Sequence, residues 1–493
     1  MEDTLLALDA GTTGVSALLF DRELRPIQRA YREFAQRFPH PGWVEHEAAA
    51  ILAAVDAVLA EVLAHPRAAG VAALGLTNQR ETVFALERAS GRALAPGIVW
   101  QDRRTEERCA ELRAAGHEAR VHARTGLVLD PYFSATKIEW LLQNDAALAA
   151  RARGGEVVFG TVDTLILAHL TGAQDYATDP TNASRTLLFD VATRRFDAEL
   201  CALFGVERAW LPEVRGSRAD FGHTLPARTA GRAVPIRGVA GDQQAALFGQ
   251  GCFDPGTLKV TYGTGSFLLL NTGAERRDSA GGLLTTLAVG RDGGAVFALE
   301  GSVFVCGALV QWLRDQLGMI ARAAEIEPLA RSVPDAGGVF VVPAFAGLGA
   351  PHWDAGARGA ILGLTRGSSR AHIARAALES LAFQNGELIE LLRKESGHPV
   401  ETLLADGGAA ENDLLMQLQA DLARVRVRRP GNLAATARGA AALAGLGIGL
   451  WSDPDAPAGL RDGAVDFEPG LPEPERKRRM QAWKRAVRRV RSR

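Results

Sequence analysis

The sequence has few cysteines, no apolar run long enough to cross a membrane and almost no net charge. Its 493 residues include only four cysteines, and 56 basic residues nearly balance 57 acidic ones. The cysteines are widely separated and form no metal-ligand pair, which suits a reducing compartment, so we predict buried free thiols in a cytoplasmic protein. The near-neutral charge excludes a general attraction to nucleic acid or to a membrane surface.

A chain of this length exceeds what one compact core serves, so two domains are predicted. The longest run of small apolar residues, Gly439–Trp451, has about 13 residues, short of the roughly 20 that a membrane-spanning helix needs. No signal peptide is expected, because acidic residues lead directly into the first predicted strand. Glycine and proline cluster in Phe248–Gly256, which divides the chain into domains of residues 1–248 and 249–493.

The stretch LALDAGTTGVSALLFD, Leu6–Asp21, predicts a strand that ends near Asp9, a Gly-Thr-Thr-Gly turn and a second strand. Neither a lysine nor a helix follows the turn, which excludes the Walker-type phosphate loop, a glycine-rich loop followed by Gly-Lys-Ser/Thr and a helix. Backbone N–H groups and threonine hydroxyls in such a turn can still bind phosphate, and Asp9 can hold Mg²⁺. An ordinary hairpin turn explains this stretch alone equally well.

A similar pattern recurs half a chain later, in LKVTYGTGSFLLLN, Leu258–Asn271. Two hairpins of this kind, one in each predicted domain, favour a phosphate-binding cleft over two chance turns. A third glycine-rich turn lies in Glu401–Ala423, between a predicted strand and a helix with apolar residues at Leu414, Leu415, Leu418 and Leu422. Taken alone, this third turn is explained as a tight connection between the predicted strand and the helix. Helices are also predicted over residues 133–144 and 372–394, and the alternation of strands and helices indicates an α/β fold.

Four short stretches are rich in polar residues suited to a small hydroxylated substrate: TNQRET (77–82), WQDRRT (100–105), DPYFS (130–134) and VAGDQQAALFG (239–249). Arg80 and Glu81 offer a donor beside an acceptor, although this pair taken alone is better explained as a surface ion pair. Asp242 follows a predicted strand near the second hairpin. It is the better candidate to accept the proton of a hydroxyl group during phosphoryl transfer.

These stretches are similar to motifs of the FGGY family of carbohydrate kinases, and the resemblance to that family extends from Leu5 to about Trp451. The resemblance rests on long motifs: PGWVEHE, TNQRETVFALE, IVWQDRRT, TGLVLDPYFSATKIEWLL, FGTVDTLIL, TNASRTLLFD, LPEVRGS, GVAGDQQAALFGQ, TYGTGSFLLLNTG, LEGSVFVCGALVQWLRD, VVPAFAGLGAPHWD, ARGAILGLTRG and DGGAAENDLLMQ. It implies an α/β fold with two actin-like (ribonuclease-H-like) ATPase domains flanking a cleft. Within the family, the chain is most similar to members that phosphorylate glycerol with Mg-ATP to sn-glycerol 3-phosphate. That similarity implies a cytoplasmic homo-oligomer, either a dimer or a tetramer, with glycerol and ATP as its partners.

The resemblance also implies roles for residues at matching positions. The β- and γ-phosphates of ATP would contact Thr12, Thr13 and Thr264, and the rest of the nucleotide would lie against Gly307, Gln311, Gly408 and Asn412. The glycerol hydroxyls would bind Arg80, Glu81, Tyr132, Asp242 and Gln243, with Trp100 and Phe267 covering the carbon backbone. Asp242 would be the general base, and Asp9 and Asp242 would hold Mg²⁺.

The chain departs from the family pattern at several places, two of which bear on phosphate binding and regulation. Ser16 stands where the first hairpin often carries an arginine. Members inhibited by fructose 1,6-bisphosphate carry Gly-Gly-x-Arg before the GDQQ strand, whereas here Arg232 comes one place early and only one glycine is present. Two other functions stay open: phosphorylation of another polyol or sugar, and an actin-like nucleotide switch that binds a protein. The sequence NQRET argues against xylulose kinases, which tend to carry Met-His-Gly after the glutamine.

The C-terminal tail, from Pro472 onward, carries ten basic residues against two acids. Met480, Trp483, Val487 and Val490 recur at helical spacing. We therefore predict a helix that packs this stripe on the body of the protein and exposes its basic face. A nucleic-acid-binding tail is the alternative, but the segment lacks the interleaved aromatic residues that stack on bases.

Overall fold

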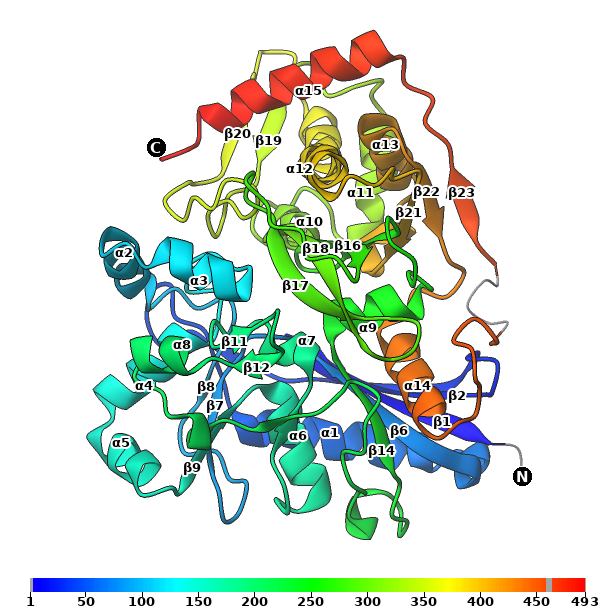
Figure 1. The fold of residues 1–493 in the computed structure, drawn as a ribbon. Helices are drawn as coiled ribbons and strands as arrows, with labels where there is room; N and C mark the ends of the chain where they lie inside the picture. The colour runs from blue at the N-terminus through cyan, green and yellow to red at the C-terminus, as the bar shows by residue number, and fades with distance from the viewer. Residues whose placement is uncertain (1–2, 458–462, 493) are drawn as a thin grey trace.

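The computed structural model describes residues 3–457 and 463–492, and its chain forms two halves, each built on a mixed β-sheet (Figure 1). The first sheet has the strand order β14 (Ile236–Gly241), β6 (Val71–Asn78), β1 (Thr4–Ala10), β2 (Gly14–Phe20) and β3 (Pro26–Glu33). Strands β1, β2 and β3 are antiparallel neighbours, whereas β6 and β14 continue the sheet in parallel with β1.

The second sheet repeats this arrangement. Its order is β17 (Leu284–Val289), β18 (Ala295–Val303), β16 (Ser266–Gly273), β15 (Leu258–Tyr262), β21 (Thr402–Asp406), β22 (Arg426–Arg429) and β23 (Val465–Phe467). As in the first sheet, a hairpin of two antiparallel strands, β15 and β16, is followed by a strand parallel to its first member, β21. The hairpin repeat read from the sequence is therefore a repeat of sheet architecture.

Between β6 and β14 the chain forms a helix-rich insertion with short paired strands. It contains β7 (Phe84–Glu87), β8 (Gly97–Ile98), α2 (Glu106–Ala114), α3 (Glu118–Thr125), α4 (Ala135–Asn144), α5 (Ala146–Arg153), β9 (Val157–Gly160), α6 (Val162–Thr171), β10 (Ala177–Thr178), α7 (Pro180–Ala183), β11 (Phe189–Asp190), β12 (Arg195–Phe196), α8 (Ala198–Leu203) and β13 (Glu213–Val214). The helix predicted over residues 133–144 is confirmed as α4. Helix α6 of this insertion and α1 (Ala48–Leu63), which follows β4 (Gln36–Arg37) and β5 (Glu45–His46), cover one face of the first sheet, while most of the other insertion helices share a separate core with residues of the second sheet.

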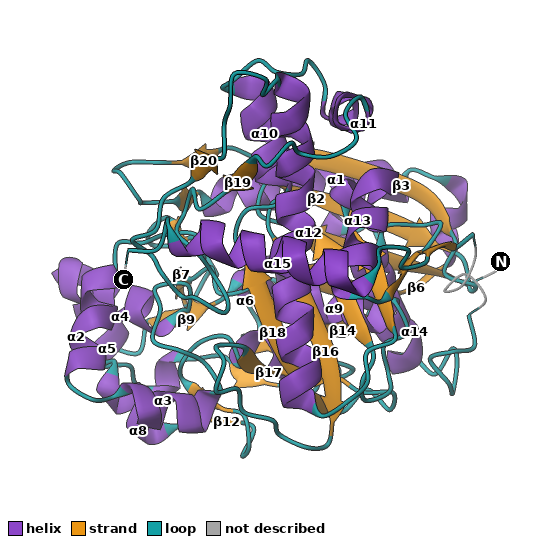
Figure 2. Cartoon of the chain, turned by 90° about the horizontal axis from the view of Figure 1, so that it is seen from above, coloured by secondary structure: helices purple, strands orange, loops and turns teal. Residues whose placement is uncertain are grey.

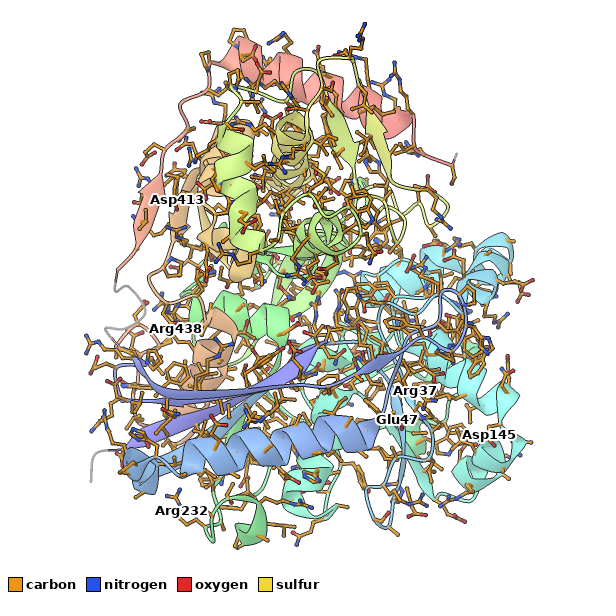
Figure 3. All side chains as sticks on the ribbon, turned by 180° about the vertical axis from the view of Figure 1, so that it is seen from behind. Arg37, Glu47, Asp145, Arg232, Asp413 and Arg438 are labelled. Atoms are coloured by element: carbon orange, nitrogen blue, oxygen red, sulfur yellow. The ribbon has the colours of Figure 1, made fainter. Side chains whose placement is uncertain are left out.

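A helix from late in the sequence, α14 (Ala435–Gly447), packs on strands β1, β6 and β14 of the first sheet and on α9 (Asp242–Gly249). Backbones approach closely here: a Cβ atom added to Gly439 would lie 1.8 Å from the carbonyl oxygen of Ala245. Arg438, labelled in Figure 3, is buried on this helix and donates from Nε to the carbonyl oxygen of Gly249 at 2.9 Å. The two halves of the sequence are thus interleaved at this helix.

The second sheet is covered by α12 (Arg370–Ser396) and α13 (Asp413–Ala423), and α15 (Glu473–Arg488) packs on these helices. Helices α10 (Gly307–Asp315) and α11 (Ile326–Arg331) and strands β19 (Phe340–Val342) and β20 (Ala360–Leu362) complete this half. Helix α15 runs across the outer side of the second half of the molecule (Figure 2). Met480, Trp483 and Val487 are buried, and Trp483 stacks on Phe383 with ring centroids 5.3 Å apart. The predicted packing of the tail helix is confirmed for its described residues; Arg493 lies outside them.

The predicted helices over residues 372–394 and after the Asp-Gly-Gly turn are confirmed as α12 and α13, and the four predicted apolar residues of α13 are buried. The four cysteines are buried and free, as predicted. Within residues 3–457 and 463–492, no helix is both long and apolar enough to cross a membrane.

Candidate active site

The two predicted phosphate hairpins face the same cavity. Gly11–Thr13 connects β1 to β2, and Gly263–Gly265 connects β15 to β16; both turns line a cavity of about 260 Å³. Each turn is closed by a hydrogen bond of 2.9 Å from its first N–H: Gly11 donates to Gly14 O across two residues, and Gly263 donates to Gly265 O across one residue. Loops from two sheets thus bring glycine-rich backbone and threonine side chains to one cavity, a combination that can bind phosphate.

Arg80 and Glu81 follow β6 at the base of this cavity. Their side chains are each only 2% exposed, so the interpretation of this pair as a surface ion pair is wrong. Glu81 has a φ of 63°, a left-handed backbone conformation that costs free energy for a residue with a Cβ atom. The surrounding contacts must offset that cost, and the result is a carboxylate turned inward beside an arginine.

A buried ion network holds this pair. This buried ion network consists of Arg80, Glu81, Arg185 and Glu300. Glu300, on β18, accepts from both terminal nitrogens of Arg80 at 2.7 and 2.9 Å, and Arg185 donates to Glu300 at 2.9 Å and to Glu81 at 2.7 Å. Burial alone would raise the pKa of Glu300, but Arg185 and Arg80 hold it at about 2, so this carboxylate is ionised.

Asp242 and Gln243 begin α9 directly after β14, and both side chains line the cavity. Asp242 lies 3.5 Å from Nε of Arg80 and keeps a quarter of its side chain exposed. Gln243 accepts a hydrogen bond from the fully buried Lys259, which also donates to Thr261 at 2.8 Å. Burial raises the pKa of Asp242, against the charges of Arg80 and Lys259.

Asp9, the next-to-last residue of β1, also lines the cavity. Burial, followed by the charge of Asp242, raises its pKa to about 7. Two carboxylates of raised pKa in one polar cavity fit a divalent cation, which would favour the ionised form of both. Within the described residues, no cluster of three or more His, Cys, Asp or Glu side chains could hold a metal.

Aromatic rings form an apolar wall of the cavity. Trp100 packs edge-to-face on Tyr132 and on Phe267, with ring centroids 5.6 and 6.0 Å apart. All three line the cavity and are at most 9% exposed. The indole Nε1 of Trp100 donates to the hydroxyl of Thr12 at 2.9 Å, so the aromatic wall is fixed to the first hairpin.

A second cavity of about 450 Å³ adjoins the first, since Gly263 and Thr264 line both. Gly307, Gln311, Gly408 and Asn412 line it, together with apolar residues such as Val310 and Leu381. Gly307 lies against the second hairpin, where an added Cβ atom would be 2.8 Å from Gly263 O. The second cavity has room for a nucleoside, with its phosphates reaching the hairpins.

The structure therefore brings every predicted site residue to one of two adjoining cavities; their individual roles stay predictions. The residues that hold these site side chains in place were not predicted from the sequence; they are Glu300, Arg185 and Lys259. A signal was available for Glu300 and for Lys259, because each is a single charged residue within an apolar strand. Gly11, Gln79 and Thr261 also line the first cavity; they lie in stretches selected from the sequence but had no assigned role. Thr436, from α14, lines it too and was not predicted.

Family models match both halves of the chain: the N-terminal domain of the FGGY family of carbohydrate kinases over residues 4–249, and its C-terminal domain over residues 258–448. The chain belongs to the FGGY family of carbohydrate kinases. Its resemblance to this family, first inferred from the sequence motifs, is confirmed.

Sequence similarity to curated members of the family extends over nearly the whole chain. Proteins named glycerol kinase from Thermus brockianus and Carboxydothermus hydrogenoformans are 54% and 48% identical to it, each over 99% of this chain and 98% of the relative. The crystal structure of Plasmodium falciparum glycerol kinase with ADP has a TM-score of 0.90 and 34% identity, covering 99% of this chain and 98% of that one. A xylulose kinase from Lactobacillus acidophilus, at 21% identity and a TM-score of 0.84, shares the fold. The predicted α/β fold of two actin-like FGGY domains is confirmed.

Proposed function

We propose that this protein transfers the γ-phosphoryl group of ATP to glycerol and so produces sn-glycerol 3-phosphate. The observation that carries the proposal is the single cavity in which two Gly-Thr hairpins face a buried Arg80–Glu81 pair and Asp242. Full-length similarity to glycerol kinases selects glycerol from among the polyols that such a cavity accepts. An actin-like switch has no need of a hydroxyl-binding pocket beneath its phosphate loops.

In this mechanism, Arg80, Glu81, Tyr132 and Gln243 hydrogen-bond the glycerol hydroxyls, while Trp100 and Phe267 contact its carbon backbone. Asp242 accepts the proton of the attacking hydroxyl at a carboxylate oxygen. Thr12 and Thr13 from one hairpin and Thr264 from the other bind the β- and γ-phosphates. The nucleoside lies against Gly307, Gln311, Gly408 and Asn412.

Asp9 and Asp242 would hold Mg²⁺, which, when bound, neutralises charge that develops on the transferring phosphoryl group. The two hairpins then orient the phosphates, and the aromatic wall limits the access of water to them. We further propose the domain division at residues 248 and 249, a cytoplasmic location, and a homo-oligomer, either a dimer or a tetramer.

The proposed activity is tested by measuring ADP release from Mg-ATP against a panel of polyols and sugars that includes glycerol, xylitol and xylulose. Glycerol is expected to give the highest kcat/KM, with phosphate on a terminal hydroxyl. ADP release that no polyol stimulates would favour the nucleotide switch, and a preference for xylulose would favour a sugar kinase.

Glycerol is expected to lower the dissociation constant of ATP, because the two hairpins belong to different sheets and both must contact the phosphates. The measurement is calorimetric titration of a non-hydrolysable ATP analogue with and without glycerol. Hydrogen-exchange protection near Thr264 should rise in the ternary complex. Equal ATP affinity under both conditions would contradict closure of the halves around the substrates.

Fructose 1,6-bisphosphate is expected to inhibit this protein weakly or not at all, because the Gly-Gly-x-Arg pattern is broken. Arg232 lies at the edge of the first half (Figure 3) and donates to the carbonyl oxygen of Ala69 at 2.9 Å. The test is glycerol-dependent ADP release with increasing bisphosphate. Strong inhibition below millimolar concentration that disappears in Arg232→Ala would refute this expectation.

A further inference from the structure

Arg80 has little hydrogen-bonding capacity left for a substrate. A guanidinium group carries five N–H donors, four of them on its terminal nitrogens. One terminal nitrogen donates to Glu300 at 2.7 Å and to Gln244 at 3.2 Å, and the other donates to Glu300 at 2.9 Å and to Tyr132 at 3.4 Å. Only Nε remains, and its nearest acid, Asp242, is 3.5 Å away, beyond a normal hydrogen-bond length.

Glu81 is restricted in a similar way. Its Oε1 accepts from Nε of Arg185 at 2.7 Å, and Nε of Arg80 is 3.8 Å from the same oxygen. In the described part of the chain, no residue donates a hydrogen bond to Oε2. Because the left-handed backbone fixes this side chain beside Arg80, the pair presents one N–H donor and one carboxylate oxygen to the cavity.

Two residues impose this arrangement from outside the pair. Glu300 comes from β18 of the second sheet and is completely buried, so the other half of the molecule holds the arginine of the first half. Arg185, also completely buried, follows α7 and bridges Glu81 to Glu300 with two different nitrogens. Neither Glu300 nor Arg185 lines the cavity.

We propose that Glu300 and Arg185 are positioning residues that leave one donor of Arg80 and one acceptor oxygen of Glu81 for two adjacent hydroxyls of the polyol. This inference rests on the proposed function and explains how the site selects its substrate. A site with one fixed donor and one fixed acceptor binds a vicinal diol well and leaves a polar atom unpaired when either hydroxyl is missing.

The test compares glycerol with propane-1,2-diol and propane-1,3-diol, each of which lacks one hydroxyl. In Glu300→Gln, one oxygen that accepts from Arg80 becomes an amide donor, so the arginine loses its fixed orientation. The ratio of kcat/KM for glycerol to kcat/KM for each diol is expected to fall about 10-fold or more, with KM for ATP within about threefold of wild type. A merely structural role would lower all three kcat/KM values in proportion and leave the ratio unchanged.

Arg185→Lys is the second variant, for the case in which Glu300→Gln does not fold. Lysine keeps the charge but is a point donor that cannot bridge two carboxylates as the planar guanidinium does. The same fall in the glycerol-to-diol ratio is expected. Asp190→Asn is the matched control: Asp190 is a buried carboxylate paired with Arg124 at 3.2 Å that lines neither cavity, and its loss should leave the ratio at the wild-type value.

A wild-type ratio in folded Glu300→Gln or in Arg185→Lys would overturn the inference, even if overall activity is reduced. A fall of the same size in Asp190→Asn would also overturn it, because the effect would then follow from reduced stability. If the wild-type protein does not phosphorylate glycerol, the proposed function fails and this inference fails with it. Activity of the wild type on glycerol therefore separates the two failures.

Discussion

Replacing Arg80 by alanine is expected to lower kcat/KM for glycerol on the order of 10⁴-fold, because a buried site that hydrogen-bonds a hydroxyl loses most of its discrimination without its donor. The same change leaves Glu300 with one arginine partner instead of two. Removing one partner of a buried ion pair costs about 3–5 kcal/mol of folding free energy, so a lower Tm is expected as well. Mg-ATP affinity should be preserved, because the threonine hairpins are unchanged.

Arg104→Ala is the matched control for Arg80→Ala. The Arg104 side chain is also 2% exposed and pairs with two acids, Asp102 at 2.8 Å and Glu45 at 2.9 Å, but it lines neither cavity. Both variants should unfold at lower temperature, and only Arg80→Ala should lose kcat/KM for glycerol per folded molecule. Equal losses in the two variants would show that Arg80 acts through stability and not through the polyol.

The hairpin architecture could be predicted from the sequence because its determinants are local. An apolar strand, a Gly-Thr turn and another apolar strand specify the backbone within about 15 residues, and finding the pattern twice indicates two similar sheets. The long amphipathic helices α12 and α13 follow from local periodicity in the same way. The residues that line the cavity could be selected because polar residues follow the ends of strands, where the family motifs also lie.

The supports of the site could not be predicted, because they depend on contacts between distant segments. Arg80 and Glu300 are 220 residues apart, and the sequence around Arg80 alone is typical of a polar surface turn. Their pairing requires β18 of one half to pass beside the end of β6 in the other. Likewise, the small residues of α14 predict close packing but do not indicate that the helix returns to the first sheet.

Asp242→Asn is expected to lower kcat by about 10²–10⁴-fold or more, because asparagine has the size of aspartate and cannot accept the proton of the attacking hydroxyl. A loss beyond this range would follow if the same carboxylate also holds the metal and orients the hydroxyl. The measurements are kcat, Mg-ATP affinity and Tm on the same purified variant. Binding of ATP should be preserved, because the hairpin threonines and Asp9 are unchanged. The Tm should stay close to wild type, since Asp242 lies at the first turn of α9 with part of its side chain exposed.

A structural role for Asp242 predicts a different result. Its carboxylate accepts a hydrogen bond from the N–H of Gln243 at 2.7 Å, so it could serve only to begin the helix. In that case the asparagine variant would lose Tm, and its activity would fall only with the fraction of unfolded protein. Asp197, which caps α8 by accepting from the N–H of Leu200 at 2.9 Å and lines neither cavity, provides the comparison. If Asp242→Asn behaves like Asp197→Asn, folded and binding ATP with nearly wild-type kcat, then another group accepts the proton. A large loss of kcat confined to Asp242→Asn, with ATP still bound, supports Asp242 as the group that activates the hydroxyl, because asparagine keeps the size of the side chain and lacks the proton-accepting carboxylate.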